Sequence, residues 1–292
     1  PLILIGVGLS IGFKANVWNI GAEGQFTMGA IAGGGTALFL NTQESLLVLP
    51  AVLLMGILGG VVWGMIPAFL KTKFNANEIL TSLMLSYVAL LILSYLVHGP
   101  WRDPGGYNFP ESEIFSDFAM LPILLEGTRL NLGTGFALLS VLIIYILLSR
   151  TVLGYQFKVV GLAPAAAKHA GFDRVKLIWL SMIISGGLAG LAGISEVSGT
   201  IGQLLPSVSP GYGFTAIIVA FLGRLNPVGV LFAGLIMALT YIGGENAQIE
   251  IGLPAAVTGL FQGIILFFLL ACDVLARYRL RYKPFLKARD RE

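Results

Sequence analysis

The chain has 292 residues, of which 56% are hydrophobic and 11% are charged, and its formal net charge is +3. A soluble domain carries about 25% charged residues, so this chain has too little charge to cover a soluble surface. The same composition argues against nucleic-acid binding through a basic face, intrinsic disorder and a small disulfide scaffold. What remains is a membrane protein that crosses the bilayer several times.

A membrane-spanning helix needs about 20 mostly apolar residues, and the apolar residues of this chain are grouped into segments of about that length. We expect an all-α, polytopic transmembrane bundle that forms a single domain over 1–292. Pro1 lies inside an apolar stretch without an initiator Met, so the N-terminus is expected to be truncated. In chain order the nine expected crossings are 2–13 with a continuation toward 20, 24–40, 46–70, 78–97, 132–148, 177–194, 205–222, 227–242 and 253–276.

The basic residues indicate which way the bundle faces. When the nine crossings alternate, sixteen of the 18 Lys and Arg residues fall on one side, and only Arg102 and Arg129 fall on the other, where Glu245 and Glu250 also lie. Basic residues in short loops mark the cytoplasmic side. The C-terminus, with a basic tail at 277–292, is therefore expected in the cytoplasm.

Two loops are longer than a simple turn. The loop at 99–131 is expected outside the cytoplasm, and its Pro and Gly residues exclude one continuous helix. The loop at 150–176 is expected in the cytoplasm. Its middle predicts a short helix at 163–169, with Pro164 in the first turn and Gly171 as the C-terminal cap. Such a helix across the cytoplasmic face predicts a docking element for a soluble partner.

Two interrupted segments indicate an internal repeat. Lys14 and Arg224 each lie between apolar segments and are followed two residues later by Asn16 and Asn226, so the copies are 210 residues apart (from 14 to 224). Moving the third expected crossing, 46–70, by the same 210 residues makes it overlap the last one, 253–276. Because both copies enter the membrane in the same direction, the repeat is predicted to be parallel.

Both breaks are rich in Gly and polar residues, with VWNIGAEGQF at 17–26 and SPGYGFTAIIVAFLGRLNPVG at 209–229. Irregular backbone within a membrane occurs only where protein or water satisfies its polar groups, and such broken helices are the usual sequence indication of a transport pathway. The alternative is that glycine only permits close helix packing. We assign four pairs to packing: Gly29 with Gly33, Gly60 with Gly64, Gly186 with Gly190, and Gly259 with Gly263.

Ionisable residues inside the expected crossings are scarce, and each is a functional candidate. Glu23, between Asn19 and Gln25, is the best of them; alternatively, its carboxylate stabilises a helix N-terminus near the cytoplasmic interface. Glu78 is interpreted as a charge at the start of a helix. The later crossings offer no titrating carboxylate or His, which argues against proton coupling.

Several polar and aromatic side chains could face a neutral, hydroxylated solute, Thr27 and Thr215 among them. The residues that we assign to the substrate pathway are Asn19, Glu23, Gln25, Ser82, Ser86, Tyr87, Tyr212 and Phe214.

Motifs of enzymes are missing from the sequence. It has no GxxxxGK[ST] loop for ATP phosphates, no HExxH, no paired CxxC and no GxSxG elbow. We therefore expect a transport subunit that is not an enzyme, has no catalytic residue and binds neither a metal nor a cofactor.

The run from Asn19 to Gln25 reads NIGAEGQ and resembles the signature of permease subunits in ABC importers for nucleosides, within the wider family of ribose, simple-sugar and branched-chain-like inner-membrane permeases. The stretches at 77–87 and 211–227 are similar to further family motifs, and 161–171 resembles the coupling helix that docks on the ATPase. Ala163 and Ser86 stand where the family usually has Asn.

This resemblance implies a permease of about ten crossings in the bacterial cytoplasmic membrane, which moves nucleosides. It implies a second permease copy or paralogue, an extracytoplasmic substrate-binding lipoprotein, and cytoplasmic ATPase subunits that use the ATP. The residues it places at the ATPase are Pro164, Ala165, Ala166, Lys168 and Gly171. Three alternatives stay open: a permease for ribose-like sugars, an ion- or proton-coupled carrier that works alone, and a membrane-bound structural or assembly factor without transport.

Overall fold

The structure is a computed structural model, and it describes residues 1–125, 127–128, 130–252 and 254–277. Apart from Arg277, the predicted basic tail at 277–292 lies outside these residues. The described residues contain helices and no strand, which confirms the all-α prediction. The α-helices are α1 Leu2–Lys14, α2 Ala22–Phe39, α3 Val48–Phe74, α4 Glu78–His98, α5 Leu132–Arg150, α6 Val152–Leu162, α7 Pro164–His169, α8 Arg174–Glu196, α9 Tyr212–Leu222, α10 Pro227–Ile251 and α11 Ala255–Arg277. The described residues also contain a 3₁₀-helix at Asp117–Ala119 and a π-helix at Val197–Ile201.

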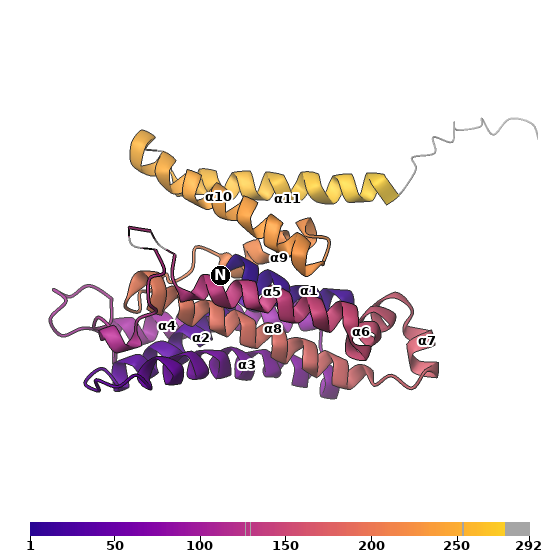
Figure 1. Cartoon of the computed structure of the whole chain (residues 1–292), viewed down its shortest axis with the longest axis horizontal. Coiled ribbons are helices and arrows are strands. Elements are labelled where there is room, and N and C mark those ends of the chain that lie inside the picture. Colours follow the sequence, from indigo (N-terminus) through magenta and orange to yellow (C-terminus); the bar gives the residue numbers. More distant parts are fainter. Residues whose placement is uncertain (126, 129, 253, 278–292) are drawn as a thin grey trace, which may run out of the picture. The chain divides into compact units, whose positions relative to one another are not determined.

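Contacts along the chain define two compact units, Pro1–Ala238 and Leu239–Glu292, with the boundary inside α10. The sequence predicts one transmembrane domain over 1–292, and this stays a prediction. The first unit holds α1 to α9 and the start of α10 (Figure 1). Every predicted site residue belongs to this first unit.

Several helices have the length and composition of membrane spans. Five described helical stretches are long and apolar enough to cross a bilayer: Val48–Phe74, Glu78–His98, Leu132–Arg150, Arg174–Ile201 and Pro227–Ile251. Large apolar side chains on three of them, such as Leu54, Leu91 and Leu142, are more than half exposed. An exposed apolar surface of this extent suits lipid rather than water, which agrees with a polytopic membrane bundle.

The helices differ from the expected crossings in four places. The first crossing, expected to continue toward 20, ends with α1 at Lys14. The helix expected at 205–222 begins only at Tyr212, because the Ser209 hydroxyl accepts the amides of Gly211 and Tyr212 in an irregular turn. The helix expected at 227–242 continues to Ile251 and includes Glu245 and Glu250, which the sequence places in an external loop. The short helix α6 is not anticipated from the sequence.

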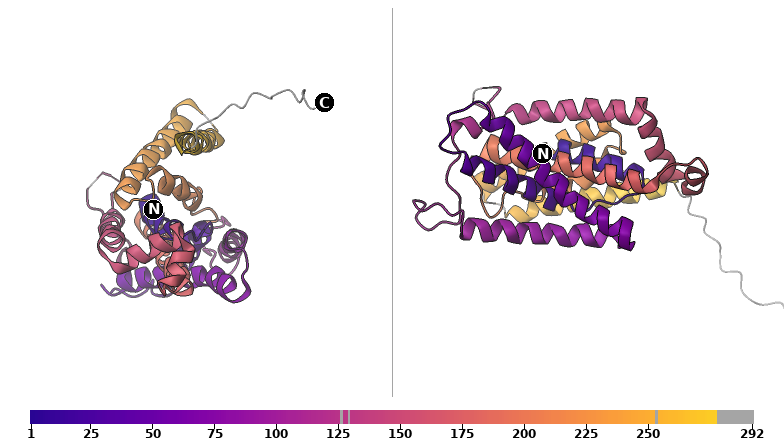
Figure 2. Two further views of the ribbon diagram at one scale, coloured as in Figure 1. Left: turned by 90° about the vertical axis from the view of Figure 1, so that its right-hand side faces the viewer. Right: turned by 90° about the horizontal axis from the view of Figure 1, so that it is seen from below.

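The tightest packing joins α2, α3 and α8 at glycines. A Cβ on Gly29 would collide with Gly190, and one on Gly60 would collide with the Gly186 carbonyl. These helices are seen end-on in the left view of Figure 2. Three of the four glycine pairs thus take part in close packing, as predicted. At Gly259 and Gly263 a Cβ would meet no described atom within 4 Å, so packing at that pair is not observed.

Helices α1 and α9 end in the same kind of turn. In α1, Asn16 N donates to Phe13 O at 3.1 Å, and in α9, Arg224 N donates to Phe221 O at 2.8 Å. Asn16 and Arg224 both have left-handed backbones, with φ of 57° and 52°. The structural register is therefore 208 residues (from 16 to 224), two fewer than the sequence alignment of Asn16 with Asn226 predicts.

The loop expected outside the cytoplasm, 99–131, is fastened to the segment that follows α8. Ser112 N donates to Leu204 O at 3.0 Å, and the Ser112 hydroxyl accepts Leu204 N at 2.9 Å. Phe115 N donates to Gly202 O at 2.9 Å. These bonds satisfy polar backbone that no regular element covers, so the loop is folded onto the bundle along this stretch.

Candidate functional site

The segment at 15–21, between α1 and α2, is not helical after the turn at Asn16. Burial alternates along it: Ala15, Val17, Asn19 and Gly21 are buried, and the residues between them are partly or fully exposed. This period of two is that of an extended chain. One side of the segment therefore faces the bundle, and the polar groups on that side need partners within the protein.

Asn19 supplies several of those partners. Its side-chain amide donates at 2.8 Å to Gln25 Oε1 and at 2.8 Å to the hydroxyl of Ser185 on α8. Its carbonyl oxygen accepts Gln25 Nε2 and the backbone amide of Gly21, both at 3.1 Å. Asn19, Gln25 and Ser185 are at most 2% exposed. Buried polar groups of this kind are stable only when paired, and here they fix the break to α2 and α8.

Two serines of α4 bind the backbone of the same motif. The Ser82 hydroxyl accepts the amide of Ile20 and the Ser86 hydroxyl accepts the amide of Gly24, both at 3.2 Å. The approach is close, because a Cβ on Gly24 would lie 2.7 Å from the Ser86 Cα. Only glycine permits this spacing, so Gly24 brings the two helices within reach of the hydroxyls.

Glu23 lies in the first turn of its own helix, α2, and its carboxylate also reaches the N-terminus of α9. Its carboxylate accepts the backbone amide of Gly213 at 2.6 Å and also interacts with Ser209 and the Phe214 amide. A Cβ on Gly213 would collide with the Glu23 backbone. A helix N-terminus has unpaired amides and a positive dipole end. The Glu23 carboxylate therefore provides an acceptor and a complementary charge for the first amides of α9.

All eight predicted pathway residues lie on adjoining elements: the segment at 15–21, α2, α4 and α9. Tyr212 packs against Phe26, with ring centroids 6.1 Å apart, and Phe214 follows Gly213 at the start of α9. Tyr87, by contrast, is 53% exposed on α4, whose Ser82 and Ser86 are buried. Thr27 donates to the Glu23 carbonyl, and Thr215 is buried. Contact of any of these residues with a solute stays a prediction.

Sequence reasoning missed three partners of the cluster: Ser185, Ser209 and the amide of Gly213. All three are distant in the chain from the residues that they bind, up to 190 positions for Gly213. A serine beside two glycines in α8 and a serine before a Pro-Gly turn were the available signals. Neither signal identifies a partner without the fold.

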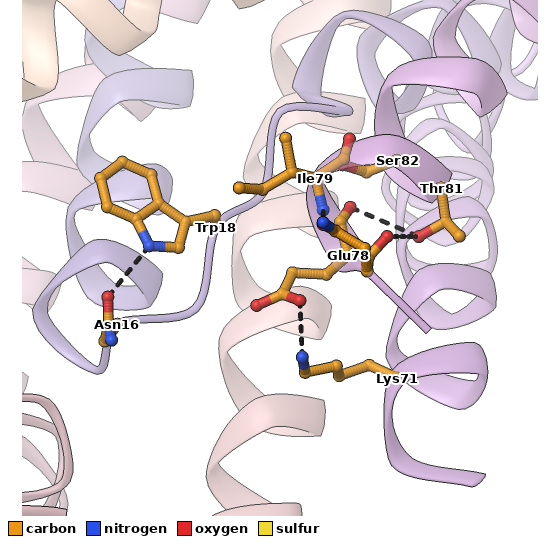
Figure 3. Close-up of polar contacts among 8 residues, drawn as sticks. Asn16, Trp18, Lys71, Glu78, Ile79, Thr81 and Ser82 are labelled. Atoms are coloured by element: carbon orange, nitrogen blue, oxygen red, sulfur yellow. Dashed lines mark hydrogen bonds and ion pairs between the residues drawn. The ribbon is translucent and has the colours of Figure 1, made fainter. Parts of the chain in front are cut away.

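Three aromatic rings meet where α1 and α9 end. Phe13 and Phe221 stack with centroids 5.3 Å apart, and Trp18 lies 5.1 Å from Phe13 and 5.9 Å from Phe221. The Trp18 indole N–H donates to Asn16 Oδ1 at 3.0 Å (Figure 3). These spacings are typical of favourable aromatic contacts. We call Phe13, Trp18 and Phe221 the ring cluster.

Glu78 has the role that the sequence predicts for it, at the start of a helix. Asn77 caps α4 by accepting the amide of Ile79, and Glu78 follows in the first turn. Its carboxylate pairs with Lys71 in the last turn of α3 at 2.9 Å (Figure 3). Both charges complement their helix dipoles, so the pair closes the α3–α4 connection.

The loop at 150–176 contains the short helix α7, with Pro164 at its first position. Gly171 has φ of +74°, Gly171 N donates to Lys168 O, and Phe172 N donates to Ala167 O at 3.0 Å. This is the glycine-terminated cap that the sequence predicts. All of α7 except Ala167 is exposed. The helix therefore presents nearly its whole surface beyond the bundle.

A separate groove of ≈ 450 Å³ lies between α3, α5 and α8. Its walls are apolar apart from Ser140, and no predicted pathway residue lines it. Such a surface suits hydrocarbon rather than a hydroxylated solute. Among the described residues, no group of three or more His, Cys, Asp or Glu side chains could hold a metal ion.

A helical membrane bundle with a broken helix and a buried polar cluster at the break has the architecture of a transport protein. Residues 1–270 match the family described as "Branched-chain amino acid transport system / permease component", and the chain belongs to that family. It is thus a relative of the permease components of ABC importers.

Individual relatives cover most of the chain. A glucose ABC transporter permease protein of Haloferax volcanii is 38% identical over 96% of this chain and 76% of its own length. A guanosine ABC transporter permease protein of Bacillus subtilis is 32% identical over 97% and 80%. A nucleoside ABC transporter permease protein of Lactococcus lactis is 29% identical over 92% and 76%. No solved structure matches the chain.

Proposed function

We propose that this chain is the membrane-spanning subunit of an ABC importer that carries nucleosides across the bacterial cytoplasmic membrane. The observation that carries the proposal is the intact NIGAEGQ motif at 19–25. Its polar groups bind α4, α8 and α9 as well as one another. Such a junction suits a permease that switches between two states, because one segment there contacts three separate helices. Guanosine and nucleoside permeases are among the relatives.

Energy would come from separate ATPase subunits, since the sequence holds no P-loop. We assign the ATPase contact to α7 through Pro164, Ala165, Ala166 and Lys168, with Gly171 ending the helix. Exposure of all five residues supports this assignment. ATP drives transport only if the ATPase binds the two permease states with different affinities. The chain itself would carry no catalytic activity and hold no cofactor.

Two further partners complete the proposed importer: a second permease, either a copy or a paralogue, and an extracytoplasmic binding protein that delivers solute to the loop at 99–131. The C-terminus would lie in the cytoplasm, as the distribution of basic residues predicts. The folded attachment of the loop to the segment after α8 supports its role as a docking surface.

A sugar is the second candidate solute, because the glucose permease of Haloferax volcanii is 38% identical to this chain. Glucose and nucleosides each contain a sugar ring that carries several hydroxyl groups. Asn19, Gln25 and Ser82 are buried and already paired within the protein, so the cluster itself does not favour one solute over the other. The choice between them is an experimental one.

The test is uptake of labelled guanosine by cells that express this permease with its ATPase and binding protein. Unlabelled nucleosides, ribose and glucose serve as competitors, and ATP depletion is compared with a protonophore at maintained ATP. Uptake that requires ATP, survives the protonophore and is blocked by nucleosides alone supports the proposal. Competition by sugars alone moves the assignment to a sugar importer. Loss of uptake with the protonophore contradicts the ABC mechanism.

A further inference from the structure

The exposed side of the segment at 15–21 carries Asn16, Trp18 and Ile20. Irregular backbone does not face lipid tails, because its polar groups have no partner there. This side therefore borders water or protein rather than hydrocarbon. Trp18 is the largest of the three side chains, and it is only partly exposed because Phe13 and Phe221 cover part of its ring.

The ring cluster joins two helices that share a turn and a register. Phe13 and Phe221 occupy the same position in the final turns of α1 and α9, each accepting the amide three residues later. The two helices run side by side in the same direction, since Gly6 lies beside Val219 and Phe13 beside Phe221. A shift of α1 relative to α9 would therefore separate the rings.

Helix α6 contacts the end of α1 directly. A Cβ on Gly161 would collide with the Lys14 carbonyl oxygen and would lie 3.3 Å from the Ala15 Cα. Gly161 is three residues before Pro164, where α7 begins. Between the helices, Ala163 N donates to Val159 O of α6 at 2.8 Å, and Ala163 O accepts Ala167 N of α7 at 3.0 Å. Lys14 is the last residue of α1 and leads into the turn at Asn16, whose side chain holds the Trp18 indole. This backbone contact thus links α7, through α6, to the end of α1 and the ring cluster.

We propose that the ring cluster is the inner gate of the solute path and that Gly161 is the positioning residue through which movement of α7 opens and closes it. This inference rests on the proposed function, because it requires an ATPase that moves α7. A contact between close-packed backbones transmits displacement because packed interiors compress little. The gate would act as an aromatic constriction, open only when α1 and α9 separate.

The first test compares Gly161→Ala with Gly135→Ala in the assembled importer in liposomes. Gly135 is a matched control, since it is a helical glycine of α5 whose Cβ would have only an ordinary contact of 3.8 Å. We expect Gly161→Ala to lower the uptake per ATP hydrolysed by about tenfold, within the usual range of coupling between sites, and Gly135→Ala to leave this ratio unchanged. A purely structural role would lower uptake and ATP hydrolysis together. Equal ratios for Gly161→Ala and the wild type overturn the proposal.

The second test leaves the Gly161 contact intact. It tests the ring cluster as a gate even if the Gly161→Ala variant fails to assemble. Liposomes are preloaded with the labelled solute that the wild type imports, guanosine or glucose, and efflux is followed without ATP. Trp18→Ala is expected to leak several-fold faster than the wild type, and Trp18→Phe, which keeps a ring, is not. A leak-free Trp18→Ala overturns the gate. A wild type that imports neither solute with ATP instead contradicts the proposed function.

Discussion

The carboxylate of Glu23 accepts a 2.6 Å hydrogen bond from the backbone amide of Gly213, which lies 190 positions later in the chain. It joins the break after α1 to the start of α9. Because α9 and α1 share a turn and a register, the bond connects the two predicted copies of the repeat at their irregular segments. Glu23 is thereby a helix-capping carboxylate inside a membrane bundle, and this position explains why a charge is tolerated there.

Glu23→Gln should impair transport without moving its pH optimum. Glutamine keeps an oxygen that can accept the Gly213 amide but loses the charge that favours the N-terminus of α9. Hydrogen bonds to charged groups contribute about 1 kcal/mol more than neutral ones, so we expect a loss of about that size and an uptake reduced several-fold. Uptake measured from acid to alkaline pH is the check. A large shift of the optimum would show that Glu23 carries a proton, and would restore the secondary-carrier alternative.

Gly213→Ala should destabilise the bundle, because the added Cβ collides with the backbone of Glu23. Overpacking of this kind costs about 1–3 kcal/mol. The expected result is a lower unfolding temperature in detergent together with reduced uptake. Gly135→Ala is the matched control and should be neutral or slightly stabilising, since alanine favours a helix over glycine by about 0.5–1 kcal/mol. Equal stability of the two variants would contradict the close approach of α2 and α9.

The sequence predicts much of this arrangement, and the rest follows from contacts that no local pattern encodes. Apolar length locates α3, α4 and α5, and the Pro-to-Gly spacing locates α7, since both signals are local. The start of α9 was misplaced because the expected crossing ran through 205–211, although this stretch holds two Pro and two Ser residues. Ser209 and Gly211 turn the chain there instead. The repeat register was wrong by two because matching Asn16 with Asn226 follows residue type, while the structure matches left-handed turns.

The sequence likewise predicts only part of the candidate cluster. Asn19, Glu23 and Gln25 share one short motif, and that motif was visible as polar residues in an apolar region. Ser185 belongs to the same network, yet it lies 166 positions from Asn19. Trp18 was visible within the break, but its stacking on Phe221 depends on α1 and α9 packing together.

Asn19→Ala should destabilise the break, because it leaves the buried side chains of Gln25 and Ser185 without the partner that each has now. An unpaired buried polar group costs about 1–3 kcal/mol. Thermal unfolding of the purified subunit measures the loss. Combining Asn19→Ala with Ser185→Ala should cost less than the two single losses added together, since residues in one network are not independent. Strict additivity would mean that the two side chains do not interact.

Gly171→Glu should abolish ATP-driven uptake while membrane insertion stays normal. Gly171 has φ of +74°, a conformation that costs other L-residues about 1–2 kcal/mol, and the cap that it forms ends the exposed helix α7. A charged side chain at this end would both strain the cap and occupy the surface that we assign to the ATPase. Uptake and the amount of permease in the membrane fraction are measured together.

Gly171→Asn is the control that separates the two effects. Asparagine tolerates the left-handed backbone and is the usual substitute for glycine at a helix cap, so this variant keeps the shape of α7 and adds no charge. It should keep most of the uptake. The amount of ATPase that copurifies with the permease should likewise be higher for Gly171→Asn than for Gly171→Glu. Normal uptake by Gly171→Glu would remove α7 as the ATPase contact, since neither strain nor charge at its end would then matter. Loss of uptake in both variants with the ATPase still bound would instead assign Gly171 to the switching movement rather than to docking.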